Sequence, residues 1–271
     1  MIDILMTTYN GSQFIAEQID SILAQDHSDF RLIIRDDSSS DNTVELIRRY
    51  KTDSRVCLLE DDLGNLGASS SFMQLIKESN APFFMLSDQD DIWLKDKISR
   101  SLEKICSMAQ RFGAHMPMLV FTDLTVTDAN ARPTYESFWK HQKLDPALSK
   151  NWKKLLAQNV VTGSTIIAND SVKPLILPYP LKEMLYDHWI AVNVAKHGRV
   201  GYLPIQTVLY RQHGTNVEGA RKAGLRYGLR KAPGLLGSIR LYRKLAGFFG
   251  DVSVSKLIFY KITINLKRIF V

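Results

Sequence analysis

Short apolar runs alternate with amphipathic segments over the first 115 residues of the chain. The apolar runs are rich in β-branched and aromatic residues, and they predict strands at residues 2–9, 30–37, 55–60 and 82–87. The intervening and following segments repeat apolar residues every three or four positions, which predicts helices at residues 12–25, 42–51, 65–79 and 95–111, the third beginning as a loop. Strands that alternate with helices indicate an α/β fold with a mostly parallel central sheet flanked by helices.

The pattern is less regular after residue 115. We expect helices at residues 151–159 and 184–198. We expect strands at residues 117–128, 163–170 and, as two short strands, within 199–214. Acidic residues almost vanish beyond residue 217, which predicts a boundary at that point.

The segment beyond this boundary is strongly basic. The whole chain has a formal net charge of +7, but residues 220–271 hold 12 basic residues and one acidic residue, while the rest of the chain carries a net charge of −4. Apolar residues recur at helical spacing in two stretches, as Leu235, Ile239, Tyr242, Leu245 and Phe249, and as Ile258, Phe259, Ile262, Leu266, Ile269 and Phe270. Basic amphipathic helices are typical of segments that bind anionic membrane surfaces. The alternative is that they pack on the rest of the protein.

Three carboxylates follow the fourth predicted strand, in the stretch SDQDDIW at residues 87–93. Like charges this close repel one another unless an opposite charge offsets them. Asn10 follows the first strand, and Asp36 and Asp37 end the second. Because ligands of open α/β sheets bind beyond the carboxyl ends of the strands, we expect these side chains to meet in one crevice. Mg²⁺ and Mn²⁺ prefer oxygen ligands, so we predict that one of them binds there. The alternative is an acidic turn that caps the helix from residue 95.

The sequence lacks the motifs of several other nucleotide-binding proteins and hydrolases. It has no GxxxxGK loop, no GxGxxG after the first strand and no GxSxG elbow. A calcium loop starting at Asp88 would need an acid or Asn at position 92 and Gly at 93, where Ile92 and Trp93 stand. These absences disfavour P-loop NTPases, NAD-dependent dehydrogenases, α/β-hydrolases and EF-hand proteins.

Four successive motifs resemble those of family 2 glycosyltransferases with a GT-A fold, namely TTYNG, RDDSSSDNT, NLGASSSF and LSDQDDIW. The last of these and the later YRQHGTN are similar to bacterial rhamnosyltransferases of that family. The resemblance spans residues 2–217. It implies a GT-A domain at 1–217, with a nucleotide-sugar-binding half (1–115) and an acceptor-binding half (116–217), followed by a basic helical tail (218–271).

The resemblance assigns donor-side roles to residues of these motifs. It implies contacts with the nucleotide sugar from Thr8, Tyr9, Asn10, Asp36, Asp37, Asn65, Gly67, Asp88, Gln89 and Arg211. It also implies that Asp90 is the principal metal ligand and that Asp91 is a second ligand or a helix cap. His213 is expected to reach the metal or the diphosphate.

The resemblance also assigns the acceptor side. Asp187, in EMLYDHW, stands at the family's acidic motif and is the expected base that deprotonates the acceptor hydroxyl. The family has Glu where Tyr186 stands, and Glu183 is the alternative base. Gly163, in TGST, is expected to let the substrate approach the backbone closely. Trp189 and Trp139 are expected to stack on a sugar, with core packing as the alternative for both rings.

These features predict an inverting, metal-dependent glycosyltransferase that uses Mg²⁺ or Mn²⁺. We expect it to transfer L-rhamnose from dTDP-L-rhamnose to a lipid-linked or growing saccharide in bacterial surface polysaccharide synthesis. The alternatives are a UDP-hexose donor, or a non-catalytic protein that binds nucleotide sugar or lipid. The sequence has no long apolar span, no apparent signal peptide and two cysteines that we interpret as buried thiols. We therefore expect a cytoplasmic protein, peripheral on the inner face of the membrane through its tail, with no nucleic-acid partner.

Overall fold

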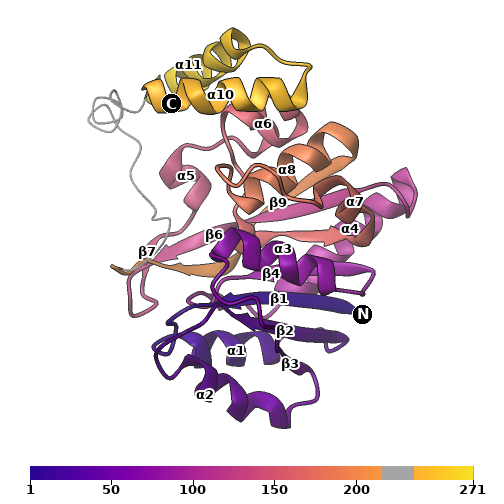
Figure 1. The fold of residues 1–271 in the computed structure, drawn as a ribbon, viewed down its shortest axis with the longest axis vertical. Helices are drawn as coiled ribbons and strands as arrows, with labels where there is room; N and C mark the ends of the chain where they lie inside the picture. Colours follow the sequence, from indigo (N-terminus) through magenta and orange to yellow (C-terminus); the bar gives the residue numbers. More distant parts are fainter. Residues whose placement is uncertain (215–234, 271) are drawn as a thin grey trace.

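The structure is a computed structural model that describes residues 1–214 and 235–270, with the backbone alone at 235–238 and 269–270. The predicted boundary at residue 217 and Thr215 and Asn216 of the YRQHGTN motif lie outside the described residues. Within them, a nine-stranded sheet has the order β3-β2-β1-β4-β8-β6-β9-β5, with β7 paired to β6. Helices cover both faces of this sheet (Figure 1). The predicted α/β fold with a mostly parallel sheet is confirmed.

The N-terminal half follows the predicted alternation of strands and helices. Its four parallel strands are β1 (Ile2–Thr8), β2 (Phe30–Asp36), β3 (Val56–Leu59) and β4 (Phe83–Ser87). Its helices are α1 (Ile15–Leu23), α2 (Thr43–Arg49), the short η1 (Tyr50–Thr52), α3 (Ala68–Glu78) and α4 (Lys97–Phe112). Every residue of β1 is buried, which is typical of a central strand with helices on both faces.

The second half mixes parallel and antiparallel strands. They are β5 (Ile92–Trp93), β6 (Met118–Thr127), β7 (Pro133–Tyr135), β8 (Ile167–Asn169) and β9 (Arg199–Arg211). The helices are α5 (Phe138–Gln142), η2 (Pro146–Lys150), α6 (Trp152–Ala157), η3 (Gly163–Thr165), η4 (Asp170–Val172), α7 (Lys173–Ile176) and α8 (Tyr186–His197). The two short strands predicted within 199–214 are one strand, β9, which runs parallel to β6 with shifts of register. The strand predicted at 163–170 begins as the helix η3.

Each face of the sheet has its own hydrophobic core. One core lies between the sheet and α1, α2 and α4 and includes Ile19, Ile47 and Ile105. The other lies under α3, α6 and α8 and includes Phe72 and Trp189. The carboxyl ends of β1, β2 and β4 are therefore held rigidly from both sides.

The tail forms α10 (Leu235–Phe249) and α11 (Val254–Phe270), at the end of the molecule opposite α2 (Figure 1). The predicted apolar stripe of α10 faces inward, because Tyr242, Leu245 and Phe249 are buried in the core that contains α6 and α8. The tail therefore shares a core with the rest of the protein.

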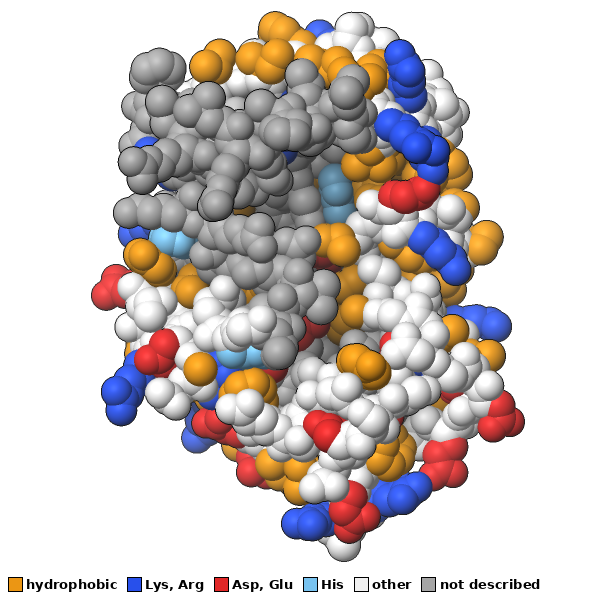
Figure 2. Space-filling view, turned by 60° about the vertical axis from the view of Figure 1, so that its left-hand side comes forward, with side chains coloured by type: hydrophobic (Ala, Val, Ile, Leu, Met, Phe, Trp, Pro, Cys, Tyr) orange, Lys and Arg blue, Asp and Glu red, His pale blue; other side chains and the backbone are white. Residues whose placement is uncertain are grey.

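The second tail helix, α11, turns much of its predicted apolar stripe outward. Its buried residues are Leu257 and Ile264, whereas Phe259, Ile262 and Leu266 of the predicted stripe are 55%, 53% and 48% exposed. Figure 2 shows hydrophobic side chains gathered at this end of the molecule, with lysine and arginine side chains beside them. The apolar arc of α11 thus lies on the surface. Among the described residues, no helix has both the length and the apolar character needed to span a membrane.

Candidate active site

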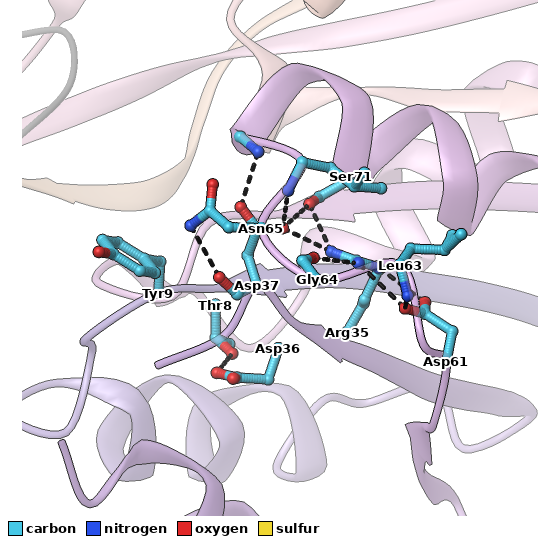
Figure 3. A network of polar contacts seen from close by, with 12 residues as sticks. Thr8, Tyr9, Arg35, Asp36, Asp37, Asp61, Leu63, Gly64, Asn65 and Ser71 are labelled. Atoms are coloured by element: carbon cyan, nitrogen blue, oxygen red, sulfur yellow. Dashed lines mark hydrogen bonds and ion pairs between the residues drawn. The ribbon is translucent and has the colours of Figure 1, made fainter. Parts of the chain in front are cut away.

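The predicted donor-side residues lie around the carboxyl ends of β1, β2 and β4, and Asp37 is the centre of a polar network there (Figure 3). Its carboxylate accepts hydrogen bonds from the backbone N–H groups of Leu66 (2.7 Å) and Gly67 (2.8 Å) and from the hydroxyl of Ser71 (2.8 Å). It also forms an ion pair with Arg35. Burial by itself raises the pKa of Asp37, but these partners outweigh it and hold the pKa below its usual value. Asp37 is 3% exposed. These bonds hold the carboxylate within the protein, and the contact of Asp37 with the base and ribose stays a prediction.

Arg35 is the buried ion-pair partner of Asp37, and the sequence analysis did not identify it. Its guanidinium bonds the carboxylates of Asp37 (2.6 Å) and Asp61 and the carbonyl of Gly64. The signal available in the sequence was weak, because Arg35 is one of two arginines in a mostly apolar strand. Through these bonds Arg35 fixes the loop before α3, whose Asn65 amide donates to the Asp37 carbonyl at 2.9 Å. Asn65 and Gly67 belong to this loop. The positive φ of 75° at Gly67 is a backbone conformation that favours glycine.

The end of β1 is joined to β2 and to the acidic stretch after β4. The Thr8 hydroxyl donates to Asp36 at 2.8 Å, and the Asn10 side chain accepts from the backbone of Ser40. The Gln89 amide exchanges two hydrogen bonds with the backbone of Tyr9, at 2.9 and 3.0 Å. Gln89 therefore clamps two loops together, which corrects its assignment as a donor-binding side chain. The Tyr9 side chain remains 52% exposed beside this clamp.

Two residues of the predicted metal site lie against each other. The Nε2 atom of His213 is 2.8 Å from Oδ2 of Asp90, although the residues are far apart in the sequence. The His213 ring also packs on Phe14, with ring centroids 4.7 Å apart. These contacts fix one carboxylate and one imidazole at the same point of the crevice.

Asp88 lies next to Asp90 and also faces the acceptor half. Burial and the charges of Asp90 and Asp187 raise the pKa of Asp88 to about 7, and a hydrogen bond from Tyr186 partly offsets this. The charges of Asp88, Asp90 and Asp187 therefore act on one another across the acidic stretch after β4 and the start of α8. His213 pairs with Asp90 at this negative centre.

Asp91 and Arg211 lie beneath this centre and are buried. The Asp91 carboxylate accepts from the backbone N–H of Arg211 at 3.2 Å, and its second oxygen has no hydrogen-bond partner among the described residues. The Arg211 guanidinium bonds the carbonyls of Asp90 and Ala129 and the carboxylate of Glu17. Arg211 is 3% exposed. This corrects its assignment to the diphosphate, because the side chain braces the backbone of Asp90 instead.

The candidate base Asp187 lies half-buried in the first turn of α8. Its neighbour Tyr186 is buried and stacks on Phe72, with ring centroids 4.2 Å apart. A side-chain carbon at position 163 would lie 2.0 Å from the Tyr186 hydroxyl oxygen. Gly163 is therefore needed to make room for Tyr186, and its role in the approach of the substrate stays a prediction.

The remaining acceptor-side predictions are corrected by burial and by pairing. Trp189 is 2% exposed and its indole N–H donates to the carbonyl of Ile176 at 2.9 Å, so the ring packs in the core and not on a sugar. Trp139 is likewise in the core. Glu183 forms an exposed ion pair with Lys244 of α10. One prediction outside the site is also wrong, since Cys57 is exposed on β3.

The described side chains provide only some of the ligands that a hard divalent cation requires. Among the described residues, no group of three or more His, Cys, Asp or Glu side chains is arranged to hold a metal ion by itself. Asp90 and His213 converge, however, and Asp88 beside them lacks a positive partner that would lower its pKa. Mg²⁺ in nucleotide enzymes is commonly held by one or two carboxylates, with substrate phosphates and water as the other ligands. The residues present fit that arrangement.

Comparison with known proteins finds relatives among glycosyltransferases. Residues 3–114 match the model of glycosyl transferase family 2. The dTDP-rhamnosyl transferase RfbG of Shigella flexneri is 28% identical over 79% of this chain and 74% of its own length. The UDP-Glc:alpha-D-GlcNAc-diphosphoundecaprenol beta-1,3-glucosyltransferase WfaP of Escherichia coli is 24% identical over 80% of this chain and 79% of its own length.

Solved structures share the fold. Staphylococcus aureus TarS 1-349 in complex with UDP-GlcNAc has a TM-score of 0.63 at 15% identity, covering 98% of this chain and 72% of TarS 1-349. The mannosyltransferase PcManGT from Pyrobaculum calidifontis, in complex with GDP-Man and Mn²⁺, has a TM-score of 0.61 at 13% identity, covering 98% of this chain and 73% of its own. The full TarS chain is covered over 53% of its length. This chain therefore shares the fold of TarS and of the mannosyltransferase PcManGT.

Proposed function

We propose that this glycosyltransferase is inverting and metal-dependent, and that it transfers L-rhamnose from dTDP-L-rhamnose to a lipid-linked or growing saccharide. The observation that carries the proposal is that the charges of both Asp90 and Asp187 raise the pKa of Asp88. This electrostatic interaction supports a role for Asp187 as a base that acts beside the donor-side acids. A non-catalytic binding protein would not need that arrangement.

On the donor side, Asp90 and His213 would hold Mg²⁺ or Mn²⁺, and Asp91 is too enclosed beneath them to serve as more than a supporting charge. When bound, the ion would offset the negative charge that develops on the departing diphosphate. Arg211 keeps Asp90 in place through its backbone carbonyl, at 2.9 Å. The exposed Tyr9 ring and the half-buried Asp36 are left to face the nucleotide.

On the acceptor side, Asp187 would remove the proton from the attacking hydroxyl as the glycosidic bond forms. Direct displacement inverts the sugar carbon, because the hydroxyl attacks the face opposite the diphosphate. The stacking of Tyr186 on Phe72 holds the start of α8 in place. Asp187 is thereby presented to the crevice from a fixed backbone.

The similarity to RfbG supports dTDP-rhamnose as the donor, and the similarity to WfaP keeps a UDP-hexose as the second candidate. A thermal-shift panel of dTDP-rhamnose, UDP-glucose, UDP-GlcNAc and GDP-mannose, each with and without Mn²⁺, separates them. A ligand that binds only the native state raises the Tm with concentration. We expect the largest shift with dTDP-rhamnose plus Mn²⁺. Equal shifts for all donors, regardless of metal, would overturn both the donor and the metal assignment.

We further propose that α11 rests on an anionic membrane surface. Its basic residues Lys261 and Arg268 turn inward, where they bond Gln158 (2.8 Å) and the carbonyl of Gln142. The apolar arc of Phe259, Ile262 and Leu266 is left outside. Exposed apolar side chains beside basic ones suit the interface of an anionic bilayer.

The membrane proposal is tested by flotation with phosphatidylcholine vesicles that contain or lack phosphatidylglycerol. We expect the wild-type protein to float with the anionic vesicles, and the Phe259→Ser/Ile262→Ser/Leu266→Ser variant to stay in solution. Leu63→Ser removes an apolar residue that is 49% exposed elsewhere and should float normally. Donor hydrolysis should be unchanged in all three proteins, so this test is independent of the catalytic assignment. Equal flotation of the triple variant and the wild type would contradict the proposal.

A further inference from the structure

A second cavity lies away from the crevice and is lined by basic residues. It has a volume of ≈ 500 Å³ and lies between the last turns of α4 and α8, the end of η2 and the start of β9. Its charged lining residues are Lys104, Arg111, Lys150 and Arg199. No aspartate or glutamate is among the described residues that line it.

The four cations have no counter-charge in the part of the chain that the structure describes. None of them forms an ion pair there. Arg111 and Arg199 both approach the ring of Phe112, at 5.1 and 5.3 Å from its centroid, and Lys150 lies 5.6 Å from the centroid of Tyr202. Ring contacts orient these groups without neutralising them. Four like charges around one cavity repel one another, and an anion would relieve that repulsion.

Helix dipoles explain only part of this arrangement. Cations near the carboxyl end of a helix are favourable, which accounts for Arg111 in the last turn of α4 and for Arg199 after α8. Lys150 likewise ends the short helix η2, whereas Lys104 lies in the middle of α4. Lys104 is not placed to complement a helix end, so its convergence with the other three cations needs another cause.

The cavity is distinct from the catalytic crevice. Asp187 is in the first turn of α8, whereas Ala195 and Gly198, at the other end of that helix, line the cavity. Twelve residues of α-helix span about 18 Å. The cavity therefore lies about 18 Å along α8 from the candidate base.

We propose that this cavity is a second anion site that binds a phosphate or diphosphate group. Arg111 and Arg199 supply planar guanidinium groups that pair with phosphate oxygens bidentately, and the two lysines add point charges. The volume is within the range of small-molecule sites. The same chemistry recognises a soluble diphosphate or the phosphate of a lipid headgroup, and the test separates the two.

Calorimetric titration of the full chain with inorganic diphosphate, at low ionic strength and without divalent metal, tests the site. We expect the Arg111→Gln/Arg199→Gln variant to bind at least about tenfold more weakly than the wild type. Arg48→Gln/Arg49→Gln removes two exposed arginines from the last turn of α2 and should bind normally. Lys104→Gln/Lys150→Gln provides a second variant in case the first one unfolds. Undetectable binding to the wild type, or equal affinity in both cavity variants and the wild type, would overturn the proposal.

A competition arm identifies the source of the phosphate. Short-chain phosphatidylglycerol below its micellar concentration is added to the diphosphate complex, and dTDP is added in a parallel titration. Displacement by the lipid supports a headgroup ligand, whereas displacement by dTDP alone supports a soluble one. In either case the displacement should disappear with the Arg111→Gln/Arg199→Gln variant.

Discussion

Asp37 and Asp88 are both carboxylates at the ends of parallel strands, but their surroundings differ. Asp37 accepts hydrogen bonds from two backbone N–H groups, a hydroxyl and Arg35, which stabilise its charge. Asp88 faces two further carboxylates and has a raised pKa. The first arrangement stabilises the fold. The second stores unfavourable electrostatic energy at the place where a cationic or phosphate-bound ligand would act, as functional sites commonly do.

The raised pKa of Asp88 gives a prediction about stability and pH. A folded-state pKa of about 7, above the ordinary 3.8, means that the native state loses stability as the pH rises from about 4 to about 7. Asp88→Asn removes that loss. We expect the metal-free variant to be more stable than the wild type by about 1–3 kcal/mol at pH 8, while turnover falls at least about 100-fold. Calorimetric melting at pH 4 and pH 8 measures the stability. If the stability of the variant depended on pH as that of the wild type does, the pKa of Asp88 would not be raised in the native state.

Gly163 and Tyr186 give a second residue-scale prediction. Because a side-chain carbon at 163 would overlap the Tyr186 hydroxyl, Gly163→Ala should destabilise the protein by about 1–3 kcal/mol and lower turnover. Tyr186→Leu removes the obstructing ring. In a double-mutant cycle followed by urea unfolding, Gly163→Ala should cost less than half as much in the Tyr186→Leu background. Equal costs in both backgrounds would mean that the two positions do not interact.

The sequence predicted the place of the site in the fold better than it predicted the role of each side chain there. The motifs predicted where the crevice lies. They did not distinguish side chains that would contact a ligand from side chains that hold the ligand-contacting residues in place. Gln89, Arg211 and Asp37 are all polar and all lie at the crevice, and each has its polar atoms bonded within the protein. Which partner a polar side chain takes depends on distant segments, such as Glu17 for Arg211, and sequence spacing does not reveal that.

At the scale of elements, hydrophobic periodicity predicted the N-terminal strands and helices because each one buries a continuous stripe. It failed where an element is short, as at β5 and β7, or where register shifts interrupt a long strand, as in β9. It also located the apolar arc of α11 but not which way the arc faces. The buried side of that helix is formed by Leu257 and Ile264, together with basic side chains that bond the body.

Arg35 joins three elements, and its removal should be costly. It links β2 to the loop at 61–64 and, through Ser71, to α3, with a side chain only 1% exposed. Arg35→Met would leave Asp37 buried without its cation, at a cost of about 3–5 kcal/mol in the free energy of unfolding. Arg100→Met breaks an exposed ion pair with Asp96 and should cost less than about 1 kcal/mol. Chemical denaturation of both variants compares them, and similar costs would argue against the bracing role.

At the scale of the whole molecule, the chain brings an acidic crevice and a basic end together in one body. Tyr242, Leu245 and Phe249 of the tail are buried in the core below α6 and α8, so α10 is part of the folded unit. Its outer helix, α11, presents an apolar arc on the surface. This arrangement suits an enzyme that works on a donor from solution and an acceptor held at a surface.

The central claim is that α8 carries the base to the donor-side acids, and turnover of the Asp187→Asn variant tests it most directly. The substitution keeps the size of the side chain and removes its basicity. We predict that kcat for sugar transfer falls about 10²- to 10⁴-fold, while the donor still raises the Tm in the presence of Mn²⁺ as it does for the wild type. Glu183→Gln, on the surface beside Lys244, should retain full activity. An Asp187→Asn enzyme with unchanged kcat would contradict the account.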